Sequence, residues 1–340
     1  MHLGRLTLES GQSLSDVTIA HETYGQLAPD GRNAILIAHG YTSHHHAAGR
    51  AHSADPQPGW WDRLIGPGKA IDTTQFFVVS SNALGSCYGT TGPTSLNPAT
   101  GKPYGPEFPN ISMRDIVMAQ RRLLERLGVT HLVAVAGPSM GGRQAFQWAV
   151  TYPDFVDGVV PVASSPKGIG KDEVIQTLIR RLATDPNWNG GWYYERGGIG
   201  PTLTALRMET LQRYGIDAIL GASHANPAER EARLRRQAEA WARRFDAHSL
   251  VVLRRASVHF DAQRDFAAIK SKVLYVLSRT DQLFPPTMGA RVMGRLQTAG
   301  VDATYVEIDT DFGHLASGRE ADKWAPTLRA FLQRLTAGRC

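Results

Sequence analysis

Cysteine is scarce in this chain, which has two, Cys87 and Cys340, among 340 residues. So few cysteines exclude both a disulfide framework and a four-cysteine zinc site. No apolar run approaches the roughly 20 residues that a membrane-spanning helix needs. The opening residues, MHLGRLTLESGQSL, lack the basic and then apolar order of a secretory signal peptide. We therefore expect a cytoplasmic protein without a membrane partner.

Charge of one sign is not in large excess, because the formal net charge is only +6. Much of it lies in the arginine-rich stretch AEREARLRRQAEAWARRF, residues 228–245. Such a stretch can bind an anionic partner such as nucleic acid. Here, however, glutamates alternate with the arginines, and apolar residues recur at helical spacing. We therefore expect a solvated amphipathic helix and no nucleic-acid partner.

What the chain does contain is an alternation of short apolar runs and helical segments. Six runs that glycine or polar turns bound are predicted as buried strands, at residues 33–40, 76–85, 131–137, 158–165, 272–278 and 303–309. Residues 112–128 predict an amphipathic helix with Ser112 as its N-cap and Gly128 as its stop. This alternation predicts an α/β protein with a mostly parallel sheet covered on both faces.

Residues 167–267 interrupt this rhythm with a largely helical pattern. We therefore predict a core formed by residues 1–166 and 268–340 and a helical lid formed by residues 167–267. A last helix is predicted from about residue 320 to residue 335.

A G-x-S-x-G motif, Gly137-Pro-Ser139-Met-Gly141, follows the predicted strand at 131–137 and precedes a helical run. A strand–turn–helix with glycines at these places raises the serine hydroxyl out of the turn, where it can act as a nucleophile. A serine needs a base and an acid that orients the base. In α/β-hydrolase sheets the chain order is serine, acid, histidine.

Two later loops supply these partners. Asp281 follows the strand at 272–278, and His314 follows the strand at 303–309. Asp309 and Asp311 are rival acids, but they lie too close in sequence to His314 for the usual geometry. We predict a Ser139–Asp281–His314 triad, in which His314 acts as base and then as acid.

Stabilising a tetrahedral intermediate requires two backbone N–H donors. The residue after the nucleophile, Met140, supplies one, and Tyr41, in the loop after the first buried strand, supplies the other.

A cluster of histidines in the same loop, His44, His45, His46 and His52, raises the possibility of a metal site. The spacing is not H-E-x-x-H, and no acidic or cysteine ligand stands among them. We therefore predict no metal, and we expect His45 and its neighbours to line the mouth of the substrate pocket.

Long motifs then reveal a family resemblance. The segments SSNALGSCYGTTGPTSLNPATGKPYGPEFPNISMRDIV (residues 80–117), AGPSMGGRQAFQW, RRFDAHSL and RTDQLFPP resemble the homoserine O-acetyltransferase family of α/β-hydrolases. The resemblance implies the α/β-hydrolase fold, the same triad, an acyl-enzyme intermediate, a helical lid and a homodimer formed through that lid. It implies no metal or prosthetic group, with acetyl-CoA as acyl donor in the transferases.

Two departures from the family bear on the acceptor. The transferases carry an aspartate after the catalytic histidine, which receives the ammonium group of the amino-acid acceptor, whereas Leu315 follows His314 here. A lid arginine engages the acceptor's carboxylate, and the sequence aligned with it has Gly215 after Tyr214. Arg207 or Arg213 could substitute for that arginine.

Losing both charge partners would make a zwitterionic acceptor costly to bury. The sequence therefore favours a carboxylic-ester hydrolase that acts on small, short-acyl esters through an acyl-Ser139 intermediate, with Tyr214 and Leu315 in the substrate pocket. The alternative is an acetyl-CoA-dependent O-acetyltransferase that uses homoserine or another alcohol. A third hypothesis is a binding protein with a silent fold, but the intact Ser-Asp-His set argues against it.

Overall fold

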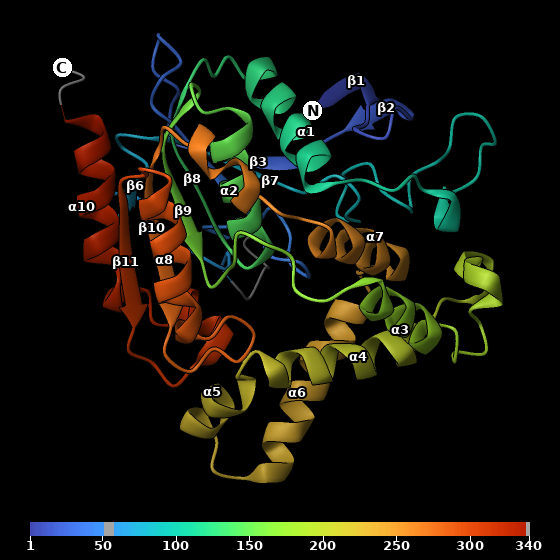
Figure 1. The fold of residues 1–340 in the computed structure, drawn as a ribbon. Coiled ribbons are helices and arrows are strands. Elements are labelled where there is room, and N and C mark those ends of the chain that lie inside the picture. The colour runs from blue at the N-terminus through green and yellow to red at the C-terminus, as the bar shows by residue number, and fades with distance from the viewer. Residues whose placement is uncertain (51–57, 338–340) are drawn as a thin grey trace.

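The computed structural model describes residues 1–50 and 58–337, so that His52 and Cys340 lie outside the described part. Its centre is a seven-stranded sheet in which every neighbouring pair of strands is parallel except β3 and β7 (Figure 1). Across the sheet the strands are β11 (Ala303–Ile308), β10 (Lys272–Ser278), β9 (Val156–Val162), β8 (Leu132–Pro138), β4 (Ala34–Ala38), β7 (Phe77–Ser81) and β3 (His21–Tyr24). The six predicted strands and the parallel sheet are confirmed.

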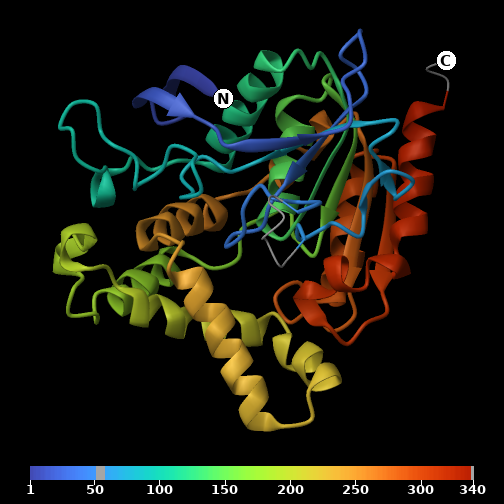
Figure 2. The same cartoon turned by 180° about the vertical axis from the view of Figure 1, so that it is seen from behind.

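Both faces of the sheet are covered, and alternate residues of a strand point to opposite faces. In β4, Leu36 packs into the cluster that contains Phe146, whereas Ile35 and Ile37 pack into the cluster that contains Phe331. The first face carries α1 (Met113–Arg126), α2 (Met140–Thr151) and α8 (Gly289–Thr298), and the second carries α10 (Ala325–Thr336). In Figure 2, which shows the molecule from behind, α10 runs along one side of the sheet. Burial on both faces explains why these strands are continuous apolar runs.

The helix predicted at 112–128 is α1, and its capping follows the sequence signal. The Ser112 hydroxyl accepts a hydrogen bond from the Asp115 backbone N–H at 3.1 Å, and Asp115 Oδ2 accepts one from the Ser112 N–H at 2.8 Å. This reciprocal capping box satisfies two N–H groups that the first turn would otherwise leave without partners.

The last helix starts later than predicted. Residues 316–323 form short turns, including α9 (Ala316–Arg319), and α10 begins at Ala325 with a proline in its first turn. Proline is tolerated there because its missing N–H would have no helical acceptor. Three further elements were not predicted, namely β3 and the antiparallel hairpin of β1 (His2–Thr7) and β2 (Ser13–Thr18). Two short strands, β5 (Ile65–Gly66) and β6 (Ile71–Asp72), form a separate pair.

Between β9 and β10 the chain forms five α-helices, of which α3–α6 lie together below the sheet in Figure 1. Their bounds are α3 (Asp172–Leu182), α4 (Gly200–Arg213), α5 (Ile216–Ser223), α6 (Pro227–Ala242) and α7 (Ala247–Val258). Helix α7 joins the two parts, since Leu253 packs into the sheet-side cluster and Val251 into the cluster with α3.

Most of the arginine-rich stretch forms α6, and two of its arginines pair with glutamates along the helix. Arg233 pairs with Glu229 and Arg235 with Glu231, each four residues apart, while Leu234 and Ala238 are buried. This is the solvated amphipathic helix that the sequence predicts. Within residues 1–50 and 58–337, no helix combines the length and apolar character that a membrane crossing requires.

Candidate active site

Ser139 lies in the tight turn between β8 and α2. Its φ of 58° and ψ of −118° fall outside the regions that side-chain-bearing residues normally adopt. The flanking glycines allow this turn, because a Cβ on Gly137 or Gly141 would lie 2.3 or 2.1 Å from the Ala38 carbonyl oxygen. The turn therefore has the strand–turn–helix form that exposes a nucleophilic hydroxyl.

Asp281 and His314 come from the loops after β10 and β11. The Nδ1 atom of His314 lies 2.8 Å from Asp281 Oδ2, and both side chains are buried. The other carboxylate oxygen accepts hydrogen bonds from the backbone N–H groups of Leu283 and Phe284, at 2.8 and 3.1 Å. Because a carboxylate only accepts, Nδ1 must carry the proton, which leaves Nε2 unprotonated as the basic nitrogen.

The rival acids are engaged elsewhere. Asp309 and Asp311 both pair with Arg279, at 2.6 and 2.9 Å, and both are largely exposed. The structure therefore brings Asp281 to His314, in agreement with the predicted order along the chain. The assignment of all three residues as a catalytic triad stays a prediction.

Two rings and the backbone at the end of α4 enclose His314. The Tyr214 ring lies 4.7 Å from the imidazole and the Phe284 ring 5.6 Å from it, measured between centroids. The backbone N–H of His314 donates to the Tyr214 carbonyl at 3.0 Å. Gly313 has a φ of 53°, and a Cβ there would lie 3.0 Å from the same carbonyl oxygen. The predicted substrate residue Tyr214 thus rests directly on the histidine loop.

The Leu315 side chain faces the helices between β9 and β10 instead of a charged group. It packs against the apolar cluster of Leu211, Ile216 and Leu234. A carboxylate at this position would enter an apolar environment, so the leucine suits the site only if no ammonium group has to be received there.

The two predicted oxyanion donors are available. Neither the Tyr41 N–H nor the Met140 N–H donates to an acceptor within the described residues. A Cβ on Gly40 would lie 3.6 Å from Ser139 Cβ, so the loop that carries Tyr41 passes beside the nucleophile. The Tyr41 hydroxyl donates to the Leu250 carbonyl at 2.6 Å and ties this loop to α7.

The histidines after this loop are not arranged as metal ligands. The described residues contain no group of three or more His, Cys, Asp or Glu side chains that could bind a metal ion. His46 Nδ1 lies 2.9 Å from Glu22 Oε2. Burial lowers the pKa of His44 to about 3 and also lowers the pKa of His45. A substrate-binding role for His45 stays a prediction.

An arginine of α4 that could substitute for the family's own is half-buried beside the loop that carries Tyr41. Arg207 Nη1 donates to Thr42 Oγ1 at 2.7 Å, and its guanidinium lies 5.0 Å from the Trp241 ring. Burial lowers the pKa of Arg207, and no carboxylate among the described residues pairs with it. Gly215, which the family pattern sets in the arginine's place, instead turns against the backbone of Phe312 and Gly313. The other candidate, Arg213, is exposed.

One sequence signal could have indicated that Arg207 and Tyr214 both face the candidate site, namely the seven-residue spacing between them. Seven residues are about two helical turns, so both side chains lie on one side of α4. The same face that presents Tyr214 to His314 therefore presents Arg207 to Thr42.

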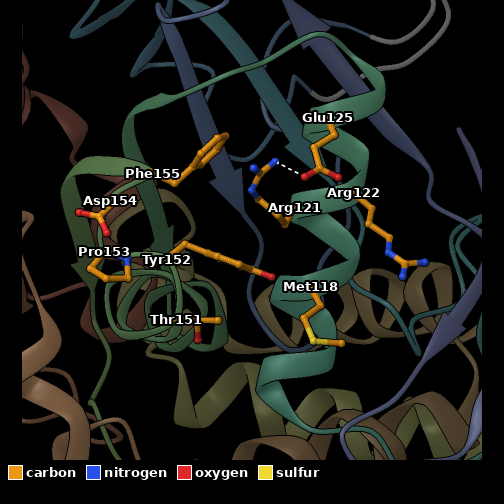
Figure 3. A pocket seen from close by; sticks show the side chains of 9 residues that line it. All are labelled: Met118, Arg121, Arg122, Glu125, Thr151, Tyr152, Pro153, Asp154 and Phe155. Atoms are coloured by element: carbon orange, nitrogen blue, oxygen red, sulfur yellow. Dashed lines mark ion pairs between the residues drawn. The ribbon is translucent and has the colours of Figure 1, made fainter.

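A cavity of the described residues lies elsewhere. It has a volume of about 550 Å³ and lies between α1 and the segment after α2, as Figure 3 shows. It is lined by Met118, Arg121, Arg122, Glu125, Thr151, Tyr152, Pro153, Asp154 and Phe155. Ser139 precedes the first residue of α2, whereas this cavity adjoins the last, so the cavity is separate from the candidate site.

Comparison with known proteins supports the fold. A family described as "alpha/beta hydrolase fold" matches residues 33–320. Homoserine O-acetyltransferase from Symbiobacterium thermophilum is 41% identical over 98% of this chain and 93% of its own length. Among solved structures, a homoserine O-acetyltransferase from Bacillus anthracis has a TM-score of 0.88 at 30% identity, covering 98% of this chain and 96% of that one.

Esterases of the same fold are equally similar in structure. Esterase E22 has a TM-score of 0.88 at 33% identity, with 98% of both chains covered. The proteins that this chain resembles therefore include some named for transfer and some named for hydrolysis. The match along nearly the whole chain shows that this protein is an α/β-hydrolase of the homoserine O-acetyltransferase family.

Proposed function

We propose that this chain is a serine-dependent O-acyltransferase that moves a short acyl group from acyl-CoA to an alcohol bearing a carboxylate. Ser139 Oγ attacks the thioester carbonyl while His314 Nε2 takes its proton, and Asp281 stabilises the imidazolium. The N–H groups of Tyr41 and Met140 stabilise the oxyanion. His314 then protonates the leaving sulfur, which gives CoA thiol and an acyl-Ser139 ester.

The second half reverses the roles of the same groups. His314 takes the proton of the acceptor hydroxyl, whose oxygen attacks the acyl-Ser139 carbonyl. When the tetrahedral intermediate collapses, Ser139 leaves and recovers its proton from His314. The products are the O-acyl ester and free enzyme.

The observation that carries the proposal is the guanidinium of Arg207. The residue is half-buried and has no carboxylate partner among the described residues, and its Nε is buried without a hydrogen-bond acceptor there. Burying a cation without an anion is unfavourable, and a charged substrate group removes that penalty. Arg207 contacts Thr42, which follows the oxyanion residue Tyr41, and Tyr214 joins the same region to His314. A carboxylate on the acceptor fits this guanidinium as a bidentate partner.

The relatives support transfer more than hydrolysis. The curated proteins near 40% identity include homoserine O-acetyltransferases and, from Pseudomonas putida, a homoserine O-succinyltransferase. The sequence alone favours the esterase because both charge partners are missing from their usual positions, and Arg207 restores one of them. Leu315 leaves the other missing, so the proposed acceptor carries a carboxylate but no ammonium group.

Ester hydrolysis is the second candidate, and Leu315 favours it. An acyl-Ser139 intermediate that meets no suitable alcohol is resolved by water, and the neighbour E22 is named an esterase. The two candidates share the first half-reaction and differ only in the group that attacks the acyl-enzyme.

The test supplies acetyl-CoA with three four-carbon acceptors: 4-hydroxybutanoate, homoserine and 1-butanol. They differ only in carrying a carboxylate, a carboxylate with an ammonium group, or neither. Released CoA thiol measures total turnover, and mass spectrometry measures the O-acetyl product. We expect 4-hydroxybutanoate to be acetylated faster than the other two. Release of acetate at one rate with every acceptor would instead establish the hydrolase.

We also propose the lid-mediated homodimer that the family resemblance implies. Size-exclusion chromatography with light scattering tests it directly, because it measures the mass in solution. A monomer would give the 37.1 kDa of one chain.

A further inference from the structure

His39, the residue after β4, is fully buried and is not part of the predicted triad. It precedes Gly40 and Tyr41, whose shared peptide bond carries the proposed oxyanion donor. Both ring nitrogens of His39 have partners. Nδ1 lies 2.8 Å from the Gly40 carbonyl oxygen, and Nε2 lies 2.9 Å from the Ala83 backbone nitrogen.

These partners fix the tautomer of the imidazole. The Ala83 N–H can only donate, so Nε2 must accept and carries no proton. The Gly40 carbonyl can only accept, so Nδ1 must carry the proton and donate it. A neutral imidazole with the proton on Nδ1 is the one state that satisfies both contacts. Burial, which lowers the pKa of His39 to about 4, keeps the ring neutral at physiological pH.

The Gly40 carbonyl and the Tyr41 N–H belong to one planar peptide unit. In a trans peptide the C=O and N–H bonds point in opposite directions, so a hydrogen bond that holds the oxygen also sets the direction of the N–H. The Ser43 N–H also donates to the Gly40 carbonyl, at 3.0 Å, so the His39 ring and Ser43 together set where the Tyr41 N–H points. The ring does this without touching the reacting atoms.

His39 is itself held in place from α2. Gln144 Nε2 donates to the His39 carbonyl at 3.3 Å, and Gln144 Oε1 accepts from Gln120 Nε2 at 2.7 Å. Trp148 Nε1 donates to Gln120 Oε1 at 2.8 Å, and all four side chains are buried. This buried network joins α1 and α2 to the end of β4 and holds the backbone of His39 in place.

We propose that His39 is a positioning residue that aims the Tyr41 N–H at the developing oxyanion through the Gly40 carbonyl. This inference rests on the proposed acyl-transfer function. The ring supplies one donor, the Nδ1–H, and one acceptor, Nε2. In this proposal the donor is the group that matters for catalysis. The contact to Ala83 anchors the ring to the chain after β7.

Two substitutions separate the donor role of Nδ1 from the acceptor role of Nε2. In His39→Asn the side-chain amide can still donate to the Gly40 carbonyl but no longer reaches the Ala83 N–H. In His39→Gln the longer side chain can accept from Ala83, and the Gly40 carbonyl keeps the Ser43 N–H as a donor but loses the imidazole Nδ1–H. His248→Gln is the matched control, because His248 is another buried histidine that contacts a carbonyl, that of Gly191 at 2.7 Å, in the lid.

The measured quantities are kcat and KM for p-nitrophenyl acetate, and the inhibition constant of a small alkylboronic acid, whose tetrahedral adduct places an oxygen in the oxyanion position. For His39→Gln we expect kcat to fall about 10- to 100-fold, part of the loss that follows removal of a whole donor. KM should stay within about twofold, and the boronate should bind more weakly in proportion to the fall in kcat/KM. His39→Asn should lose clearly less, and His248→Gln should leave kcat/KM unchanged.

A purely structural histidine gives a different pattern. The proposal is wrong if kcat falls equally in both His39 variants and the inhibition constant of the boronate rises no more than KM does. If either variant does not fold by circular dichroism, the remaining variant and the boronate comparison still decide. Failure of the proposed function is separate, because it would appear as wild-type protein that forms no acyl-enzyme and turns over no ester or thioester.

Discussion

His314 Nδ1 lies 2.8 Å from Asp281 Oδ2, although 33 residues of chain separate the two side chains. Two backbone N–H groups hold the second carboxylate oxygen, so the carboxylate cannot rotate away from the imidazole. Asp281 is thus fixed as the group that selects the imidazole tautomer. That is the role of the acid in a serine triad.

Replacing Asp281 by Asn should therefore reduce kcat by about 10⁴-fold, because an amide can hold the imidazole with the proton on the wrong nitrogen. The measurement is steady-state turnover of p-nitrophenyl acetate. Asp309→Asn is the matched control, since Asp309 lies in the next loop and pairs with Arg279 on the surface. Equal losses in the two variants would contradict the assignment of Asp281.

Removing the lid guanidinium should affect only acceptors with a carboxylate. For Arg207→Met, we expect KM for 4-hydroxybutanoate to rise about 10- to 100-fold, the value of a charge-assisted hydrogen bond. Hydrolysis of p-nitrophenyl acetate should change little, because that ester has no carboxylate. Arg207→Lys keeps the charge but loses the bidentate fork, and an intermediate KM is expected.

Arg213→Met is the control for that experiment, because it removes an exposed arginine from the same helix. An Arg207→Met variant that loses neutral-ester hydrolysis as strongly as acetyl transfer would show that Arg207 supports the Thr42 loop and does not bind the acceptor.

Local signals explain what the sequence predicts correctly. The capping box of Ser112 and Asp115 and the two glycines around Ser139 act within a few residues, and β-branched runs mark strands buried on both faces. The order serine, aspartate, histidine then predicts that the loops after β8, β10 and β11 meet at one edge of the sheet.

The features that the sequence did not predict depend on contacts between distant segments. Strand β3 is four half-exposed or exposed residues, HETY, and it is a strand because it pairs with β7. The position of Arg207 depends on how α4 docks on the loop after β4, which residue spacing alone does not determine. The same docking sets Tyr214 on His314 and leaves Gly215, where the family pattern expects the arginine, against the backbone of the histidine loop.

Position 315 should decide whether an ammonium group is accepted. In Leu315→Asp, a carboxylate beside His314 can pair with the ammonium of homoserine. We expect the ratio of homoserine to 4-hydroxybutanoate acetylation to rise about tenfold or more, the effect of one new ion pair of about 1.5 kcal/mol. Leu315→Asn is the control, because it matches the size of Asp without its charge. An equal rise in both variants would show that size, not charge, governs the acceptor.

The same substitution should destabilise the fold. A carboxylate entering the cluster of Leu211, Ile216 and Leu234 loses solvation, at a cost of about 1–3 kcal/mol. Urea unfolding of Leu315→Asp measures this, and added homoserine should restore part of the stability by binding the folded state.

Acid should weaken the folded protein as the pH falls below about 6.5, because of His39. Burial lowers its pKa to about 4 in the folded state, whereas an exposed histidine in the unfolded chain titrates near 6.5. Between these values the unfolded chain binds a proton that the folded protein does not, so stability falls as pH decreases from about 6.5 to about 4. From pH 6.5 to pH 5 the loss from this residue is about 1.5 kcal/mol. Urea unfolding at pH 8, 6.5 and 5 measures it. His39→Gln should show a shallower decline than wild type, and parallel curves for the two proteins would contradict the assignment of a neutral buried ring to His39.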